Sequence, residues 1–261
     1  MIDANVIVVK VGTSTLTYPT GLINHRKIEM LVKCLSDLQN SGKKMVLVSS
    51  GAVSAGFAKI GFSIHKLTTQ EKQAAAAVGQ CELINMYNSL FSFYGHTIAQ
   101  VLITKDVVDD EIRCANARGT FKMLLDSGCI PIVNENDTVS SEQIKFGSND
   151  TLSAIVAQLN DADLVINLTD TDGLYTADPR YDKNAEFIKY VAEITPEIES
   201  YAGGAGTGRG TGGMMAKLEA AKMCTKAGIQ MVIVNGKNPS ILYDVLEGDY
   251  HGTFFDAKKV K

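Results

Sequence analysis

The sequence lacks several features that would point to particular classes of protein. It has no excess of positive charge, since 25 Lys and Arg stand against 29 Asp and Glu, and this argues against a nucleic-acid-binding protein. No apolar run approaches the ~20 residues of a membrane-spanning helix. The N-terminus MIDANVIVVKVG has no basic region before its short apolar run. We therefore expect no signal peptide, no membrane association and a cytoplasmic location.

The cysteines and histidines are too scattered to form a recognisable disulfide or metal pattern. The five cysteines include no C-x-x-C pair, so we interpret them as reduced thiols that pack as small apolar side chains. The four histidines show no ligand spacing either. The sequence therefore predicts no zinc site.

What the chain does have is apolar sequence arranged in short runs. Its 261 residues, 45% hydrophobic and 21% charged, suffice for one large globular domain. Six runs rich in Val and Ile are apolar on both faces, as is typical of a parallel sheet covered by helices on both sides. We predict strands at 5–12, 44–50, 97–104, 129–135, 163–170 and 230–236.

The segments between these runs have apolar residues at helical spacing. We predict helices at 25–40, 68–95, 111–127, 150–160, 214–227 and 239–247. Alternation of strand and helix implies right-handed crossovers and a doubly wound α/β sheet with helices on both faces. We expect a single domain over 1–261, in which an N-terminal half (to about 160) and a C-terminal half (from about 161) share one sheet.

Unusual residues follow the strand ends, where ligands sit in folds of this class. Lys10 lies in a strand otherwise made of Val and Ile, and Gly12 follows it. This lysine could simply extend its ammonium group to solvent, or it could face a phosphate that Gly12 allows backbone amides to approach. The run SSGAVSAG at 49–56 is consistent with an anion pocket at a helix N-terminus or with close helix–strand packing.

Two longer segments are also unusual. The stretch NENDTVSSEQIKFGSND at 134–150 clusters asparagines and aspartates directly after an apolar run, so it is either a solvated loop or a binding loop. GGAGTGRGTGGMMAK at 203–217 is a glycine-rich loop that leads into a helix. It contains G-x-G-x-x-G, but no strand precedes that pattern, and the P-loop pattern is absent. We favour a mobile loop that covers a nucleotide over a flexible linker.

Together, these motifs resemble the amino acid kinase family over essentially the whole chain, and most closely its glutamate-phosphorylating members. The matching segments, in the order of the family, are VVKVGTSTLT, VSSGAVSAG, KQAAAAVGQ, PIVNENDTV, LTDTDGLYTADPR and TGGMMAKLEAA. The resemblance implies a three-layer α/β/α sandwich with a mostly parallel open sheet, with the amino acid over the N-terminal half and ATP over the C-terminal half. The implied reaction is ATP-dependent phosphorylation of the L-glutamate γ-carboxylate to L-glutamyl 5-phosphate, the first step of proline biosynthesis.

The resemblance also implies roles for individual residues. Lys10 and Lys217 would stabilise the transferring phosphoryl group, and Asp150 would hold both lysines in place. The residues implied to bind glutamate are Ser50, Gly51, Asn134, Asp137 and Asn149. Those implied to line the nucleotide site are Lys10, Thr169, Asp170, Thr211, Gly212, Gly213, Met214, Met215, Ala216 and Lys217. Mg²⁺ is expected to bind through ATP oxygens and water, without a protein ligand.

The chemistry of a carboxylate acceptor agrees with these roles. A γ-carboxyl group with a pKa of ~4.3 is already ionised at neutral pH. It needs no general base, unlike an alcohol acceptor, and the motifs contain no histidine. The obstacle is repulsion between two anions, which lysines and Mg²⁺ can offset.

Three departures from the family pattern stand out. Ser148 replaces a common aspartate, which predicts weaker glutamate affinity, and Ala216 replaces a common hydroxyl residue. The chain ends soon after HGTFFD, so we expect no C-terminal PUA domain. The family further suggests inhibition by proline through the glutamate site and a homo-oligomer, either a dimer or a tetramer.

Other interpretations remain open at this point. Related kinases that act on acetylglutamate, aspartate, carbamate or UMP would share the fold and the ATP site, and only the acceptor pocket separates them. The 134–150 segment favours free glutamate. A non-catalytic amino-acid-binding regulator would not need Lys10, Asp150 and Lys217. A redox enzyme of the Rossmann type would have its glycine signature after a strand.

Overall fold

A computed structural model describes residues 2–60, 68–140, 148–202 and 211–257. Within these residues, one sheet of eight strands has the order β3-β4-β2-β1-β5-β9-β10-β8. The strands are β1 (Val6–Val11), β2 (Lys44–Ser49), β3 (Ile98–Ile103), β4 (Ile130–Glu135), β5 (Leu164–Thr169), β8 (Tyr190–Val191), β9 (Gln230–Asn235) and β10 (Gly252–Phe255). A separate antiparallel pair joins β6 (Leu174–Tyr175) to β7 (Phe187–Ile188).

The six predicted strands are present, each within one residue of its predicted ends. Strands β1, β2, β3, β4, β5 and β9 pair in parallel, and β10 runs antiparallel to β9. The prediction of a mostly parallel α/β sheet is therefore confirmed. Strand β3 departs from the expectation of two buried faces. It lies at the edge of the sheet and most of its residues are only half-buried.

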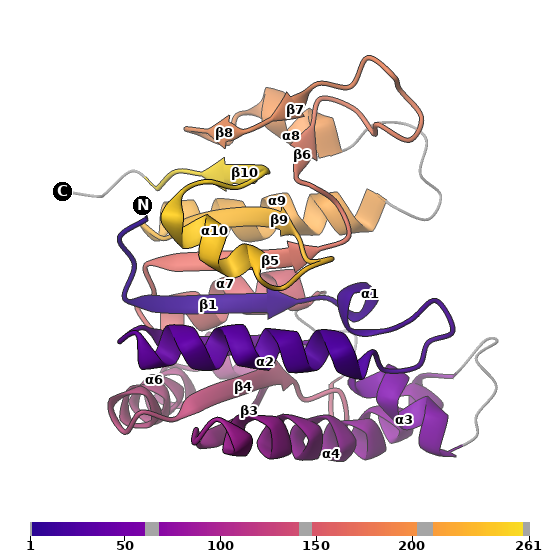
Figure 1. Cartoon of the computed structure of the whole chain (residues 1–261), viewed down its shortest axis with the longest axis vertical. Helices are drawn as coiled ribbons and strands as arrows, with labels where there is room; N and C mark the ends of the chain where they lie inside the picture. Colours follow the sequence, from indigo (N-terminus) through magenta and orange to yellow (C-terminus); the bar gives the residue numbers. More distant parts are fainter. Residues whose placement is uncertain (1, 61–67, 141–147, 203–210, 258–261) are drawn as a thin grey trace.

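Helices cover both faces of the sheet and give three layers (Figure 1). One face carries α2 (His25–Asn40), α4 (Thr69–Phe93) and α10 (Ile241–Glu247), and the other carries α6 (Glu111–Asp126), α7 (Asn149–Leu159) and α9 (Thr211–Lys226). All six predicted helices are thus present. The remaining helices of the described residues are α1 (Thr13–Leu16), α3 (Ala52–Ile60), α5 (Asp106–Asp109) and α8 (Pro196–Ala202).

Alternation along β1 divides the core between the two layers of helices. Ile7 and Val9 join the apolar cluster of α2, α4 and α10, while Val8 joins the cluster of α6, α7 and α9. Each such fully buried aliphatic side chain stabilises the fold by about 1.5–3 kcal/mol. Since side chains in a strand alternate between faces, Lys10 points to the same side as Val8, toward α7 and α9.

Two glycines bring α3 and α4 into direct backbone contact. A Cβ atom on Gly56 would lie 1.8 Å from the carbonyl oxygen of Ala75, and one on Gly79 would lie 1.7 Å from that of Ala52. Neither position can hold a larger residue without a shift of the backbone. The structure thus assigns part of the SSGAVSAG run to close packing, between two helices rather than between a helix and a strand.

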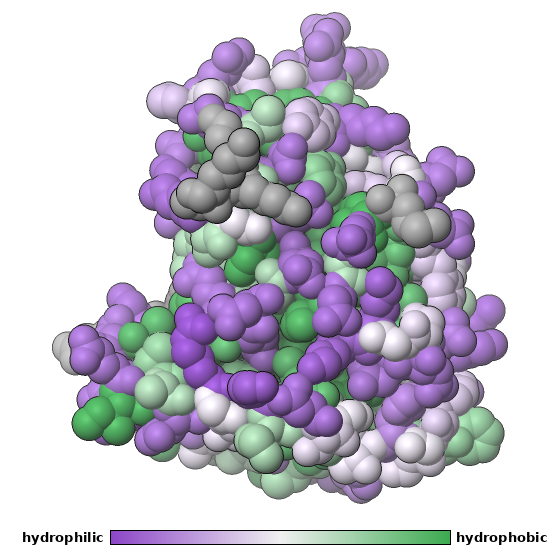
Figure 2. All heavy atoms as spheres, turned by 90° about the vertical axis from the view of Figure 1, so that its left-hand side faces the viewer, coloured by the Kyte–Doolittle hydropathy of each residue, from purple (hydrophilic) through white to green (hydrophobic). Residues whose placement is uncertain are grey.

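The surface seen from the amino ends of the strands is mostly hydrophilic, with hydrophobic residues scattered among the polar ones (Figure 2). None of the helices in the described parts of the chain is long and apolar enough to cross a membrane.

Candidate functional site

The ends of β1, α7 and α9 bring two lysines and one aspartate together. Asp150 forms ion pairs with both lysines: its Oδ1 lies 2.7 Å from Nζ of Lys10, and its Oδ2 lies 3.3 Å from Nζ of Lys217. All three side chains are buried, with exposures of only 5–7%. Two ammonium groups therefore share one carboxylate inside the protein, as the predicted roles of these residues require.

Helix α7 presents Asp150 to the lysines. Ser148 caps the helix by accepting a hydrogen bond from the backbone N–H of Thr151. Asp150 then lies in the first turn, where the positive end of the helix dipole stabilises a carboxylate. On the other side of the cluster, Lys217 also donates to the carbonyl oxygen of Gly213, one turn earlier in α9. Both helices thus fix the direction of their charged side chains.

Burial and charge act against each other on these groups. Burial lowers the pKa of Lys10, and nearby Lys217 lowers it further, while Asp150 raises it; the net shift is downward. Burial raises the pKa of Asp150, but the two lysines and a hydrogen bond from Asn167 outweigh it, so the net shift is also downward. Asp150 is therefore ionised at neutral pH and bears the charge that holds both lysines.

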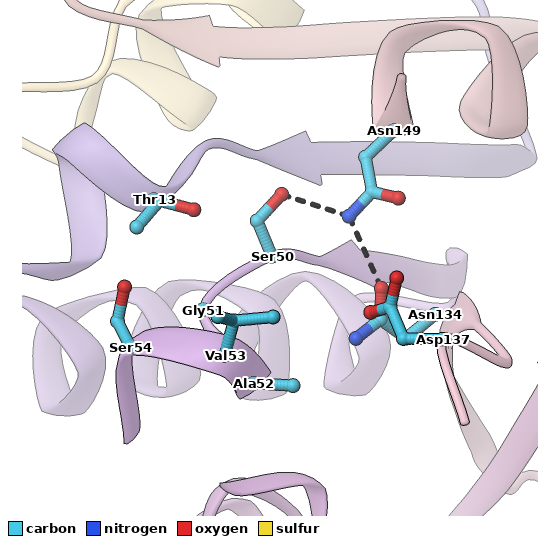
Figure 3. Close-up of a pocket in the computed structure, with 9 residues that line it drawn as sticks. All are labelled: Thr13, Ser50, Gly51, Ala52, Val53, Ser54, Asn134, Asp137 and Asn149. Carbon is cyan, nitrogen blue, oxygen red and sulfur yellow. Dashed lines mark hydrogen bonds between the residues drawn. The ribbon is translucent and has the colours of Figure 1, made fainter. Parts of the chain in front are cut away.

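A polar cavity of about 180 Å³ lies beside this cluster. Its lining residues are Thr13, Ser50, Gly51, Ala52, Val53, Ser54, Asn134, Asp137 and Asn149 (Figure 3). All five residues predicted to bind glutamate are in this lining. Asn149 connects the cavity to the charged cluster, because it directly precedes Asp150 in α7.

The start of α3 forms one wall of the cavity. Gly51 has a φ of +107°, a conformation that favours glycine, and turns the chain from β2 into the helix. The first intrahelical bond runs from the N–H of Ala55 to the carbonyl of Gly51. The preceding N–H groups at the helix start have no partner within the helix and are suited to an anion. The structure therefore also supports the anion-pocket interpretation of this run.

A chain of side-chain amides forms the opposite wall. Asn149 donates through Nδ2 to Oγ of Ser50 at 2.8 Å and to Oδ1 of Asn134 at 3.1 Å (Figure 3). Asn134 in turn donates to Oε1 of Gln80 at 3.0 Å. The Nδ2 group of Asn149 is thus engaged within the wall, between Ser50 and Asn134.

The residues predicted to line a nucleotide site lie at the carboxyl end of β5 and the start of α9. Thr169 ends β5 and is buried, and Asp170 follows it as an exposed residue whose charge reaches Lys10. The range 211–217 forms the first turns of α9, with Met215 44% exposed and Ala216 half-buried. The rest of the predicted glycine-rich loop, 203–210, lies outside the described residues, as does 141–147 of the asparagine-rich segment.

Several residues near the site were missed by the sequence analysis. Asn167 of β5 donates to Oδ1 of Asp150 at 2.6 Å, and Tyr87 of α4 is hydrogen-bonded to Ser49 at 2.9 Å behind the cavity. Gln80 is the last residue of the family segment KQAAAAVGQ, but the sequence did not predict that it contacts the cavity wall. Asn167 could have been found in the same way as Lys10, because both are polar residues inside apolar strands.

Comparisons with known proteins show which family the chain belongs to. The profile of the amino acid kinase family matches residues 5–235. A glutamate 5-kinase of Clostridium perfringens is 53% identical over 98% of this chain and 97% of its own length. A glutamate 5-kinase of Clostridium tetani is 54% identical over 98% of this chain and 96% of its own.

Solved structures share the fold at much lower identity. A carbamate kinase from Giardia lamblia bound to AMP-PNP superposes with a TM-score of 0.69 at 15% identity, over 97% of this chain and 99% of that one. A UMP kinase from Ureaplasma parvum superposes with a TM-score of 0.67 at 14% identity, over 98% of this chain and 100% of that one. From the family profile and the close relatives together, the chain belongs to the amino acid kinase family and, within it, to the glutamate 5-kinases.

Proposed function

We propose that this protein transfers the γ-phosphoryl group of ATP to the γ-carboxylate of L-glutamate, giving L-glutamyl 5-phosphate and ADP in the first step of proline biosynthesis. The observation that carries the proposal is the buried cluster of Lys10, Asp150 and Lys217 beside the polar cavity. Relatives more than 50% identical over nearly the whole chain and named glutamate 5-kinase support the choice of acceptor.

The catalytic role of the cluster follows from the charges of the reactants. The acceptor carboxylate and the γ-phosphate repel each other, and this repulsion is strongest as they meet. Lys10 and Lys217 place positive charge on the transferring group, while Asp150 offsets the repulsion between the two ammonium groups and fixes their direction. Because the acceptor is already ionised, no side chain has to remove a proton.

The cavity offers a complementary group for each end of an amino acid. We assign Asp137 to the α-ammonium group and the N–H groups at the start of α3 to the α-carboxylate. Ser50, Asn134 and Asn149 would orient the ligand through the amide chain. This arrangement leaves the γ-carboxylate directed toward Asn149 and the adjoining charged cluster.

ATP would bind over the C-terminal half, from about 161 onward, next to Thr169, Asp170 and the first turns of α9 (211–217), with glutamate over the N-terminal half. In the described residues, no group of three or more His, Cys, Asp or Glu side chains could hold a metal ion. We assign Mg²⁺ to the ATP phosphates because it keeps most of its water ligands and needs few from a protein, and it would neutralise part of the phosphate charge when bound. Lys10 and Lys217 would contact the same phosphates from the protein side.

The experiment that tests this proposal combines ADP release with hydroxylamine trapping of the acyl phosphate. We expect glutamate-dependent ADP formation and an equal amount of glutamyl hydroxamate. Acetylglutamate, aspartate, carbamate and UMP should give neither at comparable rates. ADP formation with one of these acceptors and none with glutamate would identify a different kinase, and no turnover with any acceptor would favour a non-catalytic binding protein.

Two further properties are proposals from the family resemblance. Proline would inhibit through the glutamate site, so its effect on the rate should be competitive with glutamate. The chain would form a dimer or a tetramer, which sedimentation of the purified protein can distinguish from a monomer.

A further inference from the structure

Asn167 is a fully buried amide in the middle of β5, with 0% exposure. It lies directly opposite Lys10 in the β1–β5 ladder, and both side chains point to the face covered by α7 and α9. Its Nδ2 donates to Oδ1 of Asp150 at 2.6 Å, the same oxygen that Lys10 contacts at 2.7 Å. Asn167 thus touches the group that connects the two lysines.

Packing alone does not explain an asparagine at this position. The rest of β5 reads Leu-Val-Ile before it and Leu-Thr after it, as is typical of a buried parallel strand. The Oδ1 atom of Asn167 is buried and has no hydrogen-bond partner within the described residues, and an unpaired buried acceptor is destabilising. A leucine or valine would suit the strand better, so the amide is better explained by its contact with Asp150.

We propose that Asn167 is a positioning residue for phosphoryl transfer, which fixes the rotation of the Asp150 carboxylate so that one oxygen faces Lys10 and the other faces Lys217. The inference rests on the proposed function of the cluster. The terminal torsion of an aspartate is soft, so a carboxylate needs external contacts to hold its orientation. With Oδ1 held by Lys10 and Asn167, Oδ2 is directed to Lys217, whose contact of 3.3 Å is the longest of the three.

The test uses Asn167→Leu, which keeps the size of the side chain and removes the donor. We expect kcat to fall about tenfold, equivalent to about 1.36 kcal/mol, with KM for glutamate and for ATP within about twofold of wild type. Asn167→Asp should be slower still, because it places a second carboxylate against Asp150. If Asn167→Leu does not fold, Asn167→Ala also removes the donor, with a smaller side chain.

The pH profile separates positioning from a purely structural role. The charged groups that face Asp150 are Lys10 of β1 and Lys217 of α9, and Asp170 after β5 also acts on Lys10. The hydrogen bond from Asn167 is one of the contacts that lower the pKa of Asp150. Its removal should therefore shift the acidic limb of kcat to higher pH, which a change in folding stability alone would not do.

The matched control is Asn160→Leu at the far end of α7. Asn160 is also an asparagine with a buried Oδ1 that has no partner in the described parts of the chain, but it caps the helix away from Asp150. It should alter thermal stability without changing kcat. A wild-type kcat and an unshifted acidic limb in Asn167→Leu would overturn the inference. If the wild-type protein forms no glutamyl hydroxamate, the proposed function fails instead.

Discussion

Lys217 and Asp150 come from two different helices and meet at 3.3 Å beneath the carboxyl edge of the sheet. Lys217 belongs to α9 and Asp150 to α7, so the contact depends on how these two helices pack together. We predict that Lys217→Ala lowers kcat by about 10²–10³-fold, the usual loss for one group that stabilises transition-state charge. Hydroxamate formation at saturating substrates measures this.

The same helix offers a control for this prediction. Lys222 lies further along α9 and forms an ion pair with Glu199 at the surface. Because exposed ion pairs contribute little, Lys222→Ala should leave kcat within about twofold of wild type. Full activity in Lys217→Ala would show that the cluster does not act on the phosphoryl group.

The lowered pKa of Lys10 predicts an alkaline limb in the activity profile. The protonated lysine is the form that can bind phosphate, so activity is lost as pH rises through its pKa. Burial moves that pKa downward. The loss of activity should therefore occur at a pH below ~10.4, the pKa of a free lysine. The measurement is kcat from about pH 6 to about pH 10.5 at saturating substrates.

An arginine variant provides the comparison for this pH profile. Lys10→Arg keeps its charge throughout this range, so any remaining activity should lack the limb that depends on Lys10. If the limb is the same in both proteins, another group is responsible for it.

Ser148 is both the N-cap of α7 and the residue that departs from the family pattern. Aspartate caps helices about as well as serine, so Ser148→Asp should preserve the helix while adding a carboxylate next to the cavity. We predict that KM for glutamate falls by roughly two- to fivefold, as for an ion pair of about 0.5–1 kcal/mol. Steady-state kinetics at saturating ATP test this, and an unchanged or higher KM contradicts it.

Gln80 controls the direction of the amide chain at the cavity wall. It accepts from Asn134, and this leaves Oδ1 of Asn134 to accept from Asn149. Gln80→Leu removes the acceptor and allows the Asn134 amide to rotate. We expect KM for glutamate to rise about tenfold, the effect of one lost hydrogen bond of roughly 1–1.5 kcal/mol, while KM for ATP stays the same. Equal changes in both KM values would indicate a general disturbance instead.

The crossing of α3 and α4 predicts a large difference between two glycine substitutions. In Gly79→Ala the new Cβ would collide with the backbone of Ala52, so we expect a loss of about 1–3 kcal/mol or more in the free energy of unfolding. Gly119 lies on the exposed side of α6, and a Cβ atom added there would meet no other atom within 4 Å. Gly119→Ala should therefore raise the free energy of unfolding by about 0.5–1 kcal/mol. Urea denaturation of the two variants measures both effects.

The sequence predicted the parallel part of the sheet because its strands are continuous apolar runs. It missed β10 and the short strands β6, β7 and β8, which are only two to four residues long and depend on pairing with distant segments. The convergence of Lys10, Asp150 and Lys217 could be expected only from the family resemblance, since they lie far apart in the chain. The roles of Asn167 and Gln80 depend on partners in other elements, and no local pattern identifies such partners.

The backbone contact at Gly56 and Gly79 also has a consequence for how the acceptor preference could evolve. The start of α3 lines the cavity wall to which we assign the α-carboxylate, and α4 carries Gln80, which supports the opposite wall. The distance between the two walls of the cavity therefore depends on how closely the two helices pack at Gly56 and Gly79, neither of which is among the residues that line the cavity. Substitutions at this contact between α3 and α4 would widen or narrow the cavity. They would therefore change the size of the acceptor that fits, without replacing a side chain that lines the cavity.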